Sequence, residues 1–258
     1  MRREAGVVLA LGRRALSVQF RRAQLLMPTF VLPLMLLAVI ASGTSAAQDL
    51  RGFPDVASYL AFIVPGTIIQ GALLAGLTSG TALAADIEFG FFDRLLAAPV
   101  RRTSLVIGRQ AGTLGLSVLQ TTFFLCVGLA FGAHYPGGFG AALAAIVLAA
   151  ITAVGIGGIA AAIALRTGSL SLLQSIFPFV FVLLFTAPAF FPRELLTPVL
   201  RDVAAYNPLT YVVEAVRGLL TGQHGLGDPW LGLAAAVGLA LATTTLATLA
   251  LAQRLRAT

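Results

Sequence analysis

The chain has 258 residues, of which 58% are hydrophobic and only 10% are charged, and its mean hydropathy is +0.94. An ordinary soluble domain is about 45 to 50% apolar and about 25% charged, so this composition excludes a soluble fold. The formal net charge is +7, and all 17 basic residues are arginine. Because basic residues in a membrane protein usually mark cytoplasmic loops, we do not expect a nucleic acid as a partner.

Residues 1–24 are predicted to form an amphipathic interfacial helix on the cytoplasmic surface of the membrane. At about 100° per residue, a single arc of about 100° holds the polar residues Arg3, Arg13, Arg14, Ser17 and Arg21. These arginines would lie near anionic lipid headgroups. The alternative is a secretory signal peptide, in which the arginine-rich start precedes the apolar run of residues 25–40.

Six apolar windows are each long enough, at roughly 20 residues, to cross a bilayer as a helix. They lie at about residues 25–43, 57–80, 104–131, 139–165, 171–190 and 230–252. Such uninterrupted runs lack the alternation of barrel strands, so the expected fold class is an all-α membrane protein with six transmembrane helices. We expect one domain over residues 1–258, with a six-span core over 25–252 and a cytoplasmic tail over 253–258. Pro178 and Pro188 are expected to kink the fifth span.

The arginines predict the orientation of these spans. With the N-terminus inside, only Arg51, Arg193, Arg201 and Arg217 fall outside, and the other 13 of the 17 arginines fall inside. Six spans place both termini on the same side of the membrane. The asymmetry therefore predicts cytoplasmic N- and C-termini in a multi-pass protein of the cell membrane.

The predicted cytoplasmic loop between the second and third spans has the pattern of a short amphipathic helix. Phe89, Phe92 and Leu96 are spaced three and four residues apart, so a helix would carry them on one face. Pro99 would end this helix. The apolar face would either insert into lipid or occupy a groove on a partner protein. The surrounding acidic residues favour the protein partner, because carboxylates are poorly placed against an anionic leaflet.

The predicted outer segment between the fifth and sixth spans has the pattern of two short helices. Asn207 fits the N-cap of the second helix, with Pro208 at its first position. The two helices would either dip into the outer leaflet or rest on it as a lid. Glu214 and Arg217 are three residues apart and are predicted to form a structural ion pair, with a substrate contact as the alternative. The apolar stripe of the first helix comprises Leu195, Leu196, Val199, Leu200 and Val203.

Both segments resemble motifs of a known family. The run EFGFFDRLLAAPV, from Glu88 to Val100, resembles the coupling-helix signature that follows the second span in ABC-2 type permeases of ATP-binding-cassette transporters. The run NPLTY at residues 207–211, with Glu214 and Arg217, is similar to the extracellular motif of the same family. This chain departs from the usual pattern at residues 91 and 92, where two phenylalanines replace smaller or polar residues.

The resemblance implies a half-transporter similar to the daunorubicin-resistance exporters, which pairs with a second permease and with two copies of a separate ATPase subunit. The cytoplasmic loop would seat in a cleft of the ATPase and transmit its closure. ATP and Mg would be bound by that partner, so no cofactor is expected in this chain. The outer motif comprises Asn207, Pro208, Glu214 and Arg217. The residues implied in ATPase coupling are Glu88, Gly90, Phe91, Phe92, Asp93, Arg94, Leu95 and Pro99.

The residue types that are missing bear on the energy source. A P-loop needs a lysine to reach the phosphates, and the sequence contains none. All ten carboxylates fall in predicted loops or at span ends, so no buried proton relay is indicated. His134 and His224 lie in predicted outer loops without the spacing of a metal site.

We therefore predict a non-catalytic permease of an ATP-driven exporter. Its apolar spans suit a hydrophobic or amphipathic substrate of the drug, lipid or glycan class. The alternative is a secondary active transporter that works without an ATPase, through a sodium site made of carbonyl and hydroxyl groups.

Overall fold

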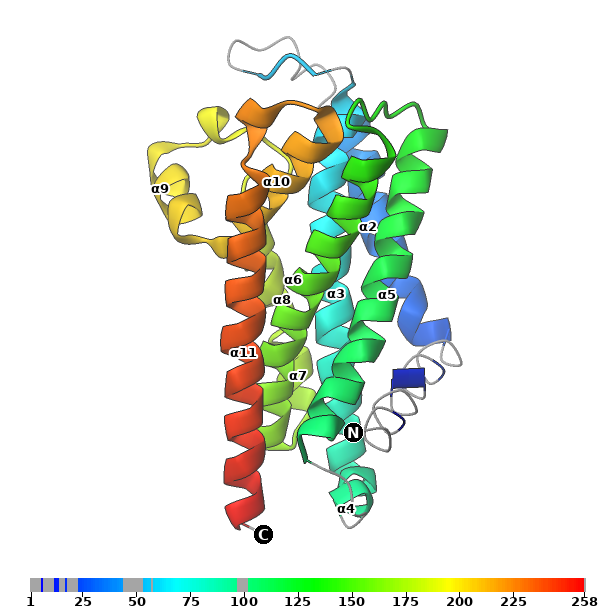
Figure 1. The fold of residues 1–258 in the computed structure, drawn as a ribbon, viewed down its shortest axis with the longest axis vertical. Coiled ribbons are helices and arrows are strands. Elements are labelled where there is room, and N and C mark those ends of the chain that lie inside the picture. Colours follow the sequence, from blue (N-terminus) through cyan, green and yellow to red (C-terminus); the bar gives the residue numbers. More distant parts are fainter. Residues whose placement is uncertain are drawn as a thin grey trace.

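The computed structural model describes residues 6, 12, 13, 17, 23–43, 53–56, 58–96 and 102–257. Every regular element within these residues is a helix, and the helices form an elongated bundle (Figure 1). The all-α membrane fold is therefore confirmed, whereas the predicted helix over residues 1–24 lies almost entirely outside the described residues. Five of the described helices are long and apolar enough to cross a membrane: α2 (Ala23–Gly43), α3 (Tyr59–Glu88), α5 (Arg102–Ala130), α6 (Gly138–Thr167) and α11 (Pro229–Ala257).

The fifth predicted span is broken into two shorter helices, α7 (Leu170–Ser175) and α8 (Phe177–Phe185). The break falls at Ile176, because Pro178 has no backbone N–H to donate and its ring clashes with a continuing helix. At 1.5 Å per residue, the two helices together extend about 24 Å, short of the roughly 30 Å hydrocarbon core. The kink is thus confirmed as a break, and the count of six spans is not confirmed for the described part of the chain.

α3 lies at the centre of the bundle, and 94% of its apolar window is buried. It packs against α2, α5 and α6 (Figure 1). The Oγ of Ser58 caps its start by accepting the N–H of Ala61 at 3.1 Å. Gly80 permits the close approach of α6, since a Cβ there would lie 2.2 Å from the Cβ of Ala160. Gly80 is therefore a packing residue of α3.

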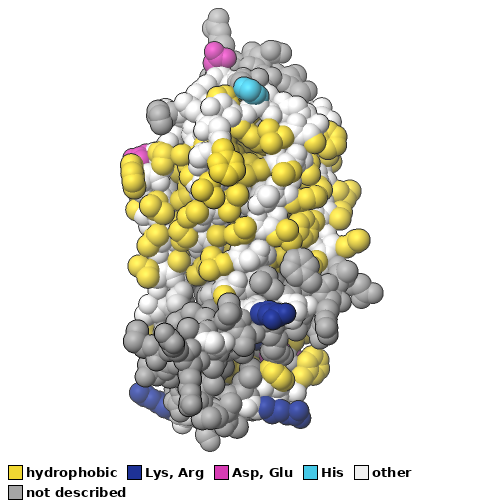
Figure 2. Space-filling model, turned by 45° about the vertical axis from the view of Figure 1, so that its right-hand side comes forward, with side chains coloured by type: hydrophobic (Ala, Val, Ile, Leu, Met, Phe, Trp, Pro, Cys, Tyr) yellow, Lys and Arg dark blue, Asp and Glu magenta, His cyan; other side chains and the backbone are white. Residues whose placement is uncertain are grey.

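Apolar and charged side chains separate along the long axis of the molecule (Figure 2). On the face shown, apolar side chains cover the middle, arginines lie at one end, and acidic side chains and a histidine lie at the other. We call these the α4 end and the α10 end, after α4 (Phe91–Leu96) and α10 (Pro208–Thr221). α11 carries Arg254 and Arg256 to the α4 end. This pattern matches an apolar belt between two aqueous surfaces.

α10 belongs to the bundle and does not form a lid over it. Its side chains Leu209, Val212 and Val216 are fully buried, and the helix packs against α3, α6 and α11. α9 (Pro198–Tyr206) lies at the edge of the bundle (Figure 1), and Val199 is 72% exposed there. The apolar stripe of α9 therefore faces outward. Two single-turn 3₁₀ helices, η2 (Arg193–Leu195) and η3 (His224–Leu226), flank this hairpin.

Candidate functional site

The connection from α3 to α4 is a tight turn at the α4 end. The N–H groups of Phe89 and Gly90 donate to carbonyls in the last turn of α3, at 2.9 and 3.0 Å. Gly90 has a φ of +72°, in the left-handed region that glycine enters at little cost. This turn lets α4 begin at Phe91, so Gly90 sets the direction of the predicted coupling helix.

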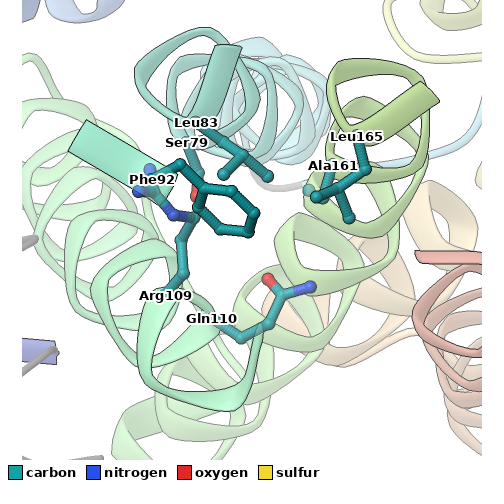
Figure 3. Close-up of a pocket in the computed structure, with 8 residues that line it drawn as sticks. Ser79, Leu83, Phe92, Arg109, Gln110, Ala161 and Leu165 are labelled. Carbon is teal, nitrogen blue, oxygen red and sulfur yellow. The ribbon is translucent and has the colours of Figure 1, made fainter. Parts of the chain in front are cut away.

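Phe92 anchors α4 to the rest of the molecule. The side chain is only 4% exposed, and its ring lies among side chains of α3, α5 and α6 (Figure 3). Phe89 is 77% exposed and precedes α4. The prediction that Phe89 and Phe92 share one helical face is therefore wrong, because the turn at Gly90 separates them. The side chain of Leu96 lies outside the described ones.

Phe92 also lines a pocket of about 370 Å³, counting its open part, between the α4 ends of three long helices. Figure 3 shows its ring in the middle of the lining side chains. Because the ring belongs to α4 and the walls to α3, α5 and α6, a displacement of α4 changes the packing of all three. The lining residues are Ser79, Leu83, Phe92, Arg109, Gln110, Gly157, Ala161 and Leu165.

An ion pair joins α5 to α3 beside this pocket. Arg109 donates from Nη2 to Oδ2 of Asp86, and the two side chains are 17% and 23% exposed. Partial burial weakens solvent screening, so this pair is stronger than one on an open surface. Sequence analysis did not single out the pair. Its signal was the presence of opposite charges at the facing ends of two consecutive spans.

Glu88 ties the end of α3 to the start of α7. Its Oε2 accepts the backbone N–H of Leu170 at 2.9 Å. The N–H groups in the first turn of a helix have no partner within the helix, so a carboxylate is well placed there. Ser169 caps the same turn by accepting the N–H of Leu172 at 3.3 Å. The predicted coupling residue Glu88 therefore has a defined contact inside the molecule.

The structure places some of the other predicted coupling residues. Phe91 is half-buried and Arg94 is exposed at the α4 end. The side chains of Asp93 and Leu95, and all of Pro99, lie outside the described residues. The described members of the set therefore meet at one end of the bundle, and their part in coupling stays a prediction.

Asn207 begins α10 and also holds the end of α8. Its Oδ1 accepts the N–H of Leu209 at 2.9 Å, and Pro208 takes the first helical position, which confirms the predicted cap. Its Nδ2 donates to the carbonyl of Leu183 at 2.7 Å and to Oγ1 of Thr186 at 3.0 Å. One side chain thus joins two helices.

Arg217 lies inside the α10 end and is only 2% exposed. Its Nη2 donates to the carbonyls of Pro188 and Ala189, both at 2.8 Å. Its Nε donates to the carbonyl of Phe62 at 3.1 Å, and the guanidinium lies 3.8 Å from the centre of the Phe62 ring. The carbonyls of a non-helical segment need such donors where water is excluded.

The predicted ion pair between Glu214 and Arg217 is not formed. The Oε1 of Glu214 instead lies 3.6 Å from Nε of Arg193. Burial raises the pKa of the Glu214 carboxyl, and the charges of Arg193 and Arg217 act against that rise. Sequence reasoning missed the acceptors of Arg217 because Phe62 lies 155 residues earlier in the chain.

The chain is similar to known proteins over most of its length. Residues 7–221 match the family model described as ABC-2 type transporter. A putative transport permease, ycf38, of Porphyra purpurea is 30% identical over 210 residues, which cover 81% of this chain and 72% of the relative. The ycf38 permease of Pyropia yezoensis is 29% identical over 219 residues, covering 84% and 75%. The daunorubicin resistance ABC transporter permease protein DrrB1 of Streptomyces coeruleorubidus is 28% identical over 189 residues, covering 70% and 64%.

Proposed function

This chain belongs to the ABC-2 type transporter family, and we propose that it is the membrane-spanning permease subunit of an ATP-driven exporter. Permeases of this family normally work with an ABC ATPase and a membrane partner. In the proposed complex, two copies of a separate ATPase subunit bind ATP and Mg and hydrolyse the ATP. This chain pairs with a second permease, identical or different, and carries no catalytic residue of its own.

The contacts of α4 are the observation that supports this proposal. α4 is inserted into the bundle through Phe92, and the adjoining end of α3 is joined to α5 through Asp86 and to α7 through Glu88. A partner that pushes on α4 therefore acts on several long helices at once. Such an arrangement suits a permease whose energy comes from a protein bound at this end.

The proposed cargo is a hydrophobic or amphipathic molecule of the drug, lipid or glycan class, moved out of the cell. The similarity to a daunorubicin resistance permease supports such a cargo. We place the α4 end on the cytoplasmic side of the cell membrane. The arginines visible in Figure 2 lie at that end, and the visible acidic residues lie at the other. The N- and C-termini would then both be cytoplasmic.

Co-purification tests the proposal most directly. The tagged chain is extracted from native membranes in mild detergent, and mass spectrometry is used to look for a P-loop ATPase in an amount equal to that of the permease. Its presence supports the ATP-driven exporter. A chain that purifies alone and still transports would instead be a secondary active transporter.

A double substitution tests whether α4 is the ATPase contact. Replacing Asp93 and Arg94 together with alanine should reduce transport and ATPase co-purification while leaving membrane insertion intact. The control is Arg166→Ala, which removes an exposed arginine at the α4 end but outside α4. Unchanged transport in the double variant, or an equal loss in the control, would rule out the assignment.

A further inference from the structure

Gln70 is a buried amide without a hydrogen-bond partner. The residue lies in the middle of α3 and is 1% exposed, and neither Oε1 nor Nε2 has a partner. An unpaired amide is costly where water is absent, so a natural sequence retains one only for a reason. Thr67 lies one turn earlier, is also fully buried, and its hydroxyl is unpaired too.

The amide of Gln70 lines a small pocket between α3 and α8. The space between its lining side chains amounts to about 140 Å³ including the open part, and none of it is wide enough for a water molecule. Apolar side chains make up the rest of its wall, so Gln70 supplies its polar atoms. Binding sites for small molecules typically combine an apolar wall with a few placed polar groups. The other lining residues are Leu73, Leu74, Val180, Phe181 and Leu184.

Two other glutamines in the bundle donate hydrogen bonds from their amides to neighbouring helices, although the Oε1 of Gln120 also has no partner. Gln120 on α5 is fully buried, and its Nε2 donates to the carbonyl of Thr29 at 3.2 Å. Gln110 donates to the carbonyl of Val154 at 3.4 Å. Each of these two joins neighbouring helices through its amide, whereas Gln70 faces the pocket and joins nothing.

α8 forms the second wall of this pocket, through Val180, Phe181 and Leu184. It is nine residues long and interrupted on both sides, at Ile176 and at Thr186. Two of its aromatic rings lie together beside the pocket: the ring centroids of Phe177 and Phe181 are 5.3 Å apart, the rings are inclined at 42°, and Phe177 is 39% exposed. An aromatic ring of a ligand can pack against one of them while a polar substituent is directed toward Gln70.

We propose that Gln70 is the polar recognition group of a binding site between α3 and α8 for an amphipathic, largely aromatic molecule. A carbonyl or hydroxyl group of the ligand exchanges hydrogen bonds with the Gln70 amide, and its apolar body lies against Phe177 and Phe181. The pocket is closed in this structure, so α8 shifts outward when the ligand enters. This site rests on the proposed function, since the ligand is the cargo of the exporter.

Gln70→Leu tests the site in two measurements on the full-length permease in lipid nanodiscs. Thermal unfolding should show a Tm raised by about 2 °C or more, because the substitution removes an unpaired buried amide. Binding of daunorubicin, followed by its fluorescence and corrected for empty nanodiscs, should weaken about tenfold, as expected for a lost hydrogen bond in a buried site. If Gln70 had only a structural role, Gln70→Leu would not raise the Tm and weaken daunorubicin binding at the same time.

Gln120→Leu is the matched control, because the same change removes a bonded amide away from the pocket. It should lower the Tm and leave daunorubicin affinity within about twofold. A lowered Tm in Gln70→Leu would show a structural partner for this side chain and overturn the proposal. Unchanged affinity in Gln70→Leu, or no daunorubicin binding by the unaltered permease, would overturn it as well.

The outcomes also separate this site from the proposed function. A permease that binds daunorubicin through Gln70 but purifies without an ATPase keeps the site and overturns the ATP-driven exporter. An ATPase partner combined with no effect of Gln70→Leu keeps the exporter and overturns the site.

Discussion

Arg217 is a buried cation whose hydrogen bonds go to backbone carbonyls. The carbonyls of Phe62, Pro188 and Ala189 accept from it. A guanidinium suits this task because it carries five N–H donors in one plane and keeps its charge. The packing of α3, α10 and the segment after α8 therefore depends on one side chain.

Arg217→Met should destabilise the permease strongly. The substitution keeps much of the apolar stem but leaves three carbonyls without their donor, at a cost of about 3 kcal/mol in the free energy of unfolding. Thermal unfolding in detergent measures the loss. The control is Arg201→Met, since Arg201 is exposed and a change there should stay within about 0.5 kcal/mol. Equal effects of the two substitutions would show that the hydrogen bonds of Arg217 to these carbonyls do not stabilise the bundle.

Gly90→Ala should cost stability through the backbone alone. The φ of Gly90 is +72°, and a Cβ would meet nothing within 4 Å, so the expected loss is about 1 kcal/mol from the left-handed conformation. Gly140→Ala is the matched change, because that Cβ also meets nothing within 4 Å and the residue lies in α6. It should raise stability by about 0.5 kcal/mol. If both substitutions changed the free energy of unfolding in the same direction, the positive φ of Gly90 would not be the cause of the loss.

At the scale of elements, α8 is held mainly through its neighbours. Before it, α7 is tied to the end of α3 by Glu88. After it, Asn207 on α10 holds the carbonyl of Leu183 and the hydroxyl of Thr186. Changes at the end of α3 and at α10, which lie at opposite ends of the molecule, therefore both affect the position of one short helix (Figure 1).

Glu88→Leu should lower transport per ATP hydrolysed while ATPase binding persists. The exposed hydrogen bond to Leu170 contributes about 0.5 to 1 kcal/mol, so a loss of about threefold is expected. Substrate efflux and phosphate release are measured on the same vesicles. Glu88→Gln keeps an acceptor oxygen and should restore part of the coupling. If Glu88→Gln and Glu88→Leu behaved alike, the hydrogen bond would not be the relevant contact.

At the scale of the whole molecule, the two ends differ in charge while the middle is apolar (Figure 2). The described arginines at the α4 end include Arg109, Arg166 and Arg254. Arginines beside a membrane span are retained on the cytoplasmic side during insertion. The distribution of charge therefore implies a single orientation for the entire bundle.

Cysteine labelling tests that orientation. In a Cys126→Ser background, Gly225→Cys places a thiol at the α10 end and Arg256→Cys places one at the α4 end; both positions are exposed. A membrane-impermeant maleimide should label Gly225→Cys in intact cells and Arg256→Cys only after permeabilisation. The reverse pattern would invert the orientation.

The apolar runs predicted the long helices well, because bilayer thickness leaves a spanning helix little choice of length. Pro178 signalled the break between α7 and α8, although the two pieces were read as a single span. The exposed position of Phe89 was missed, since it depends on the positive φ of Gly90. The acceptors of Arg217 were missed because backbone carbonyls carry no signal in the identity of a residue.

The burial of α3 has a consequence for biogenesis. Among the described long helices α3 is the second to leave the ribosome, yet it packs against α6 and α10, which are synthesised later. Until these helices arrive, the polar groups of Thr67, Gln70 and Ser79 face either lipid or an insertion factor. A nascent chain halted before α10 thus exposes a helix that is unsuited to lipid, which gives quality-control proteases a means of recognising incomplete permeases.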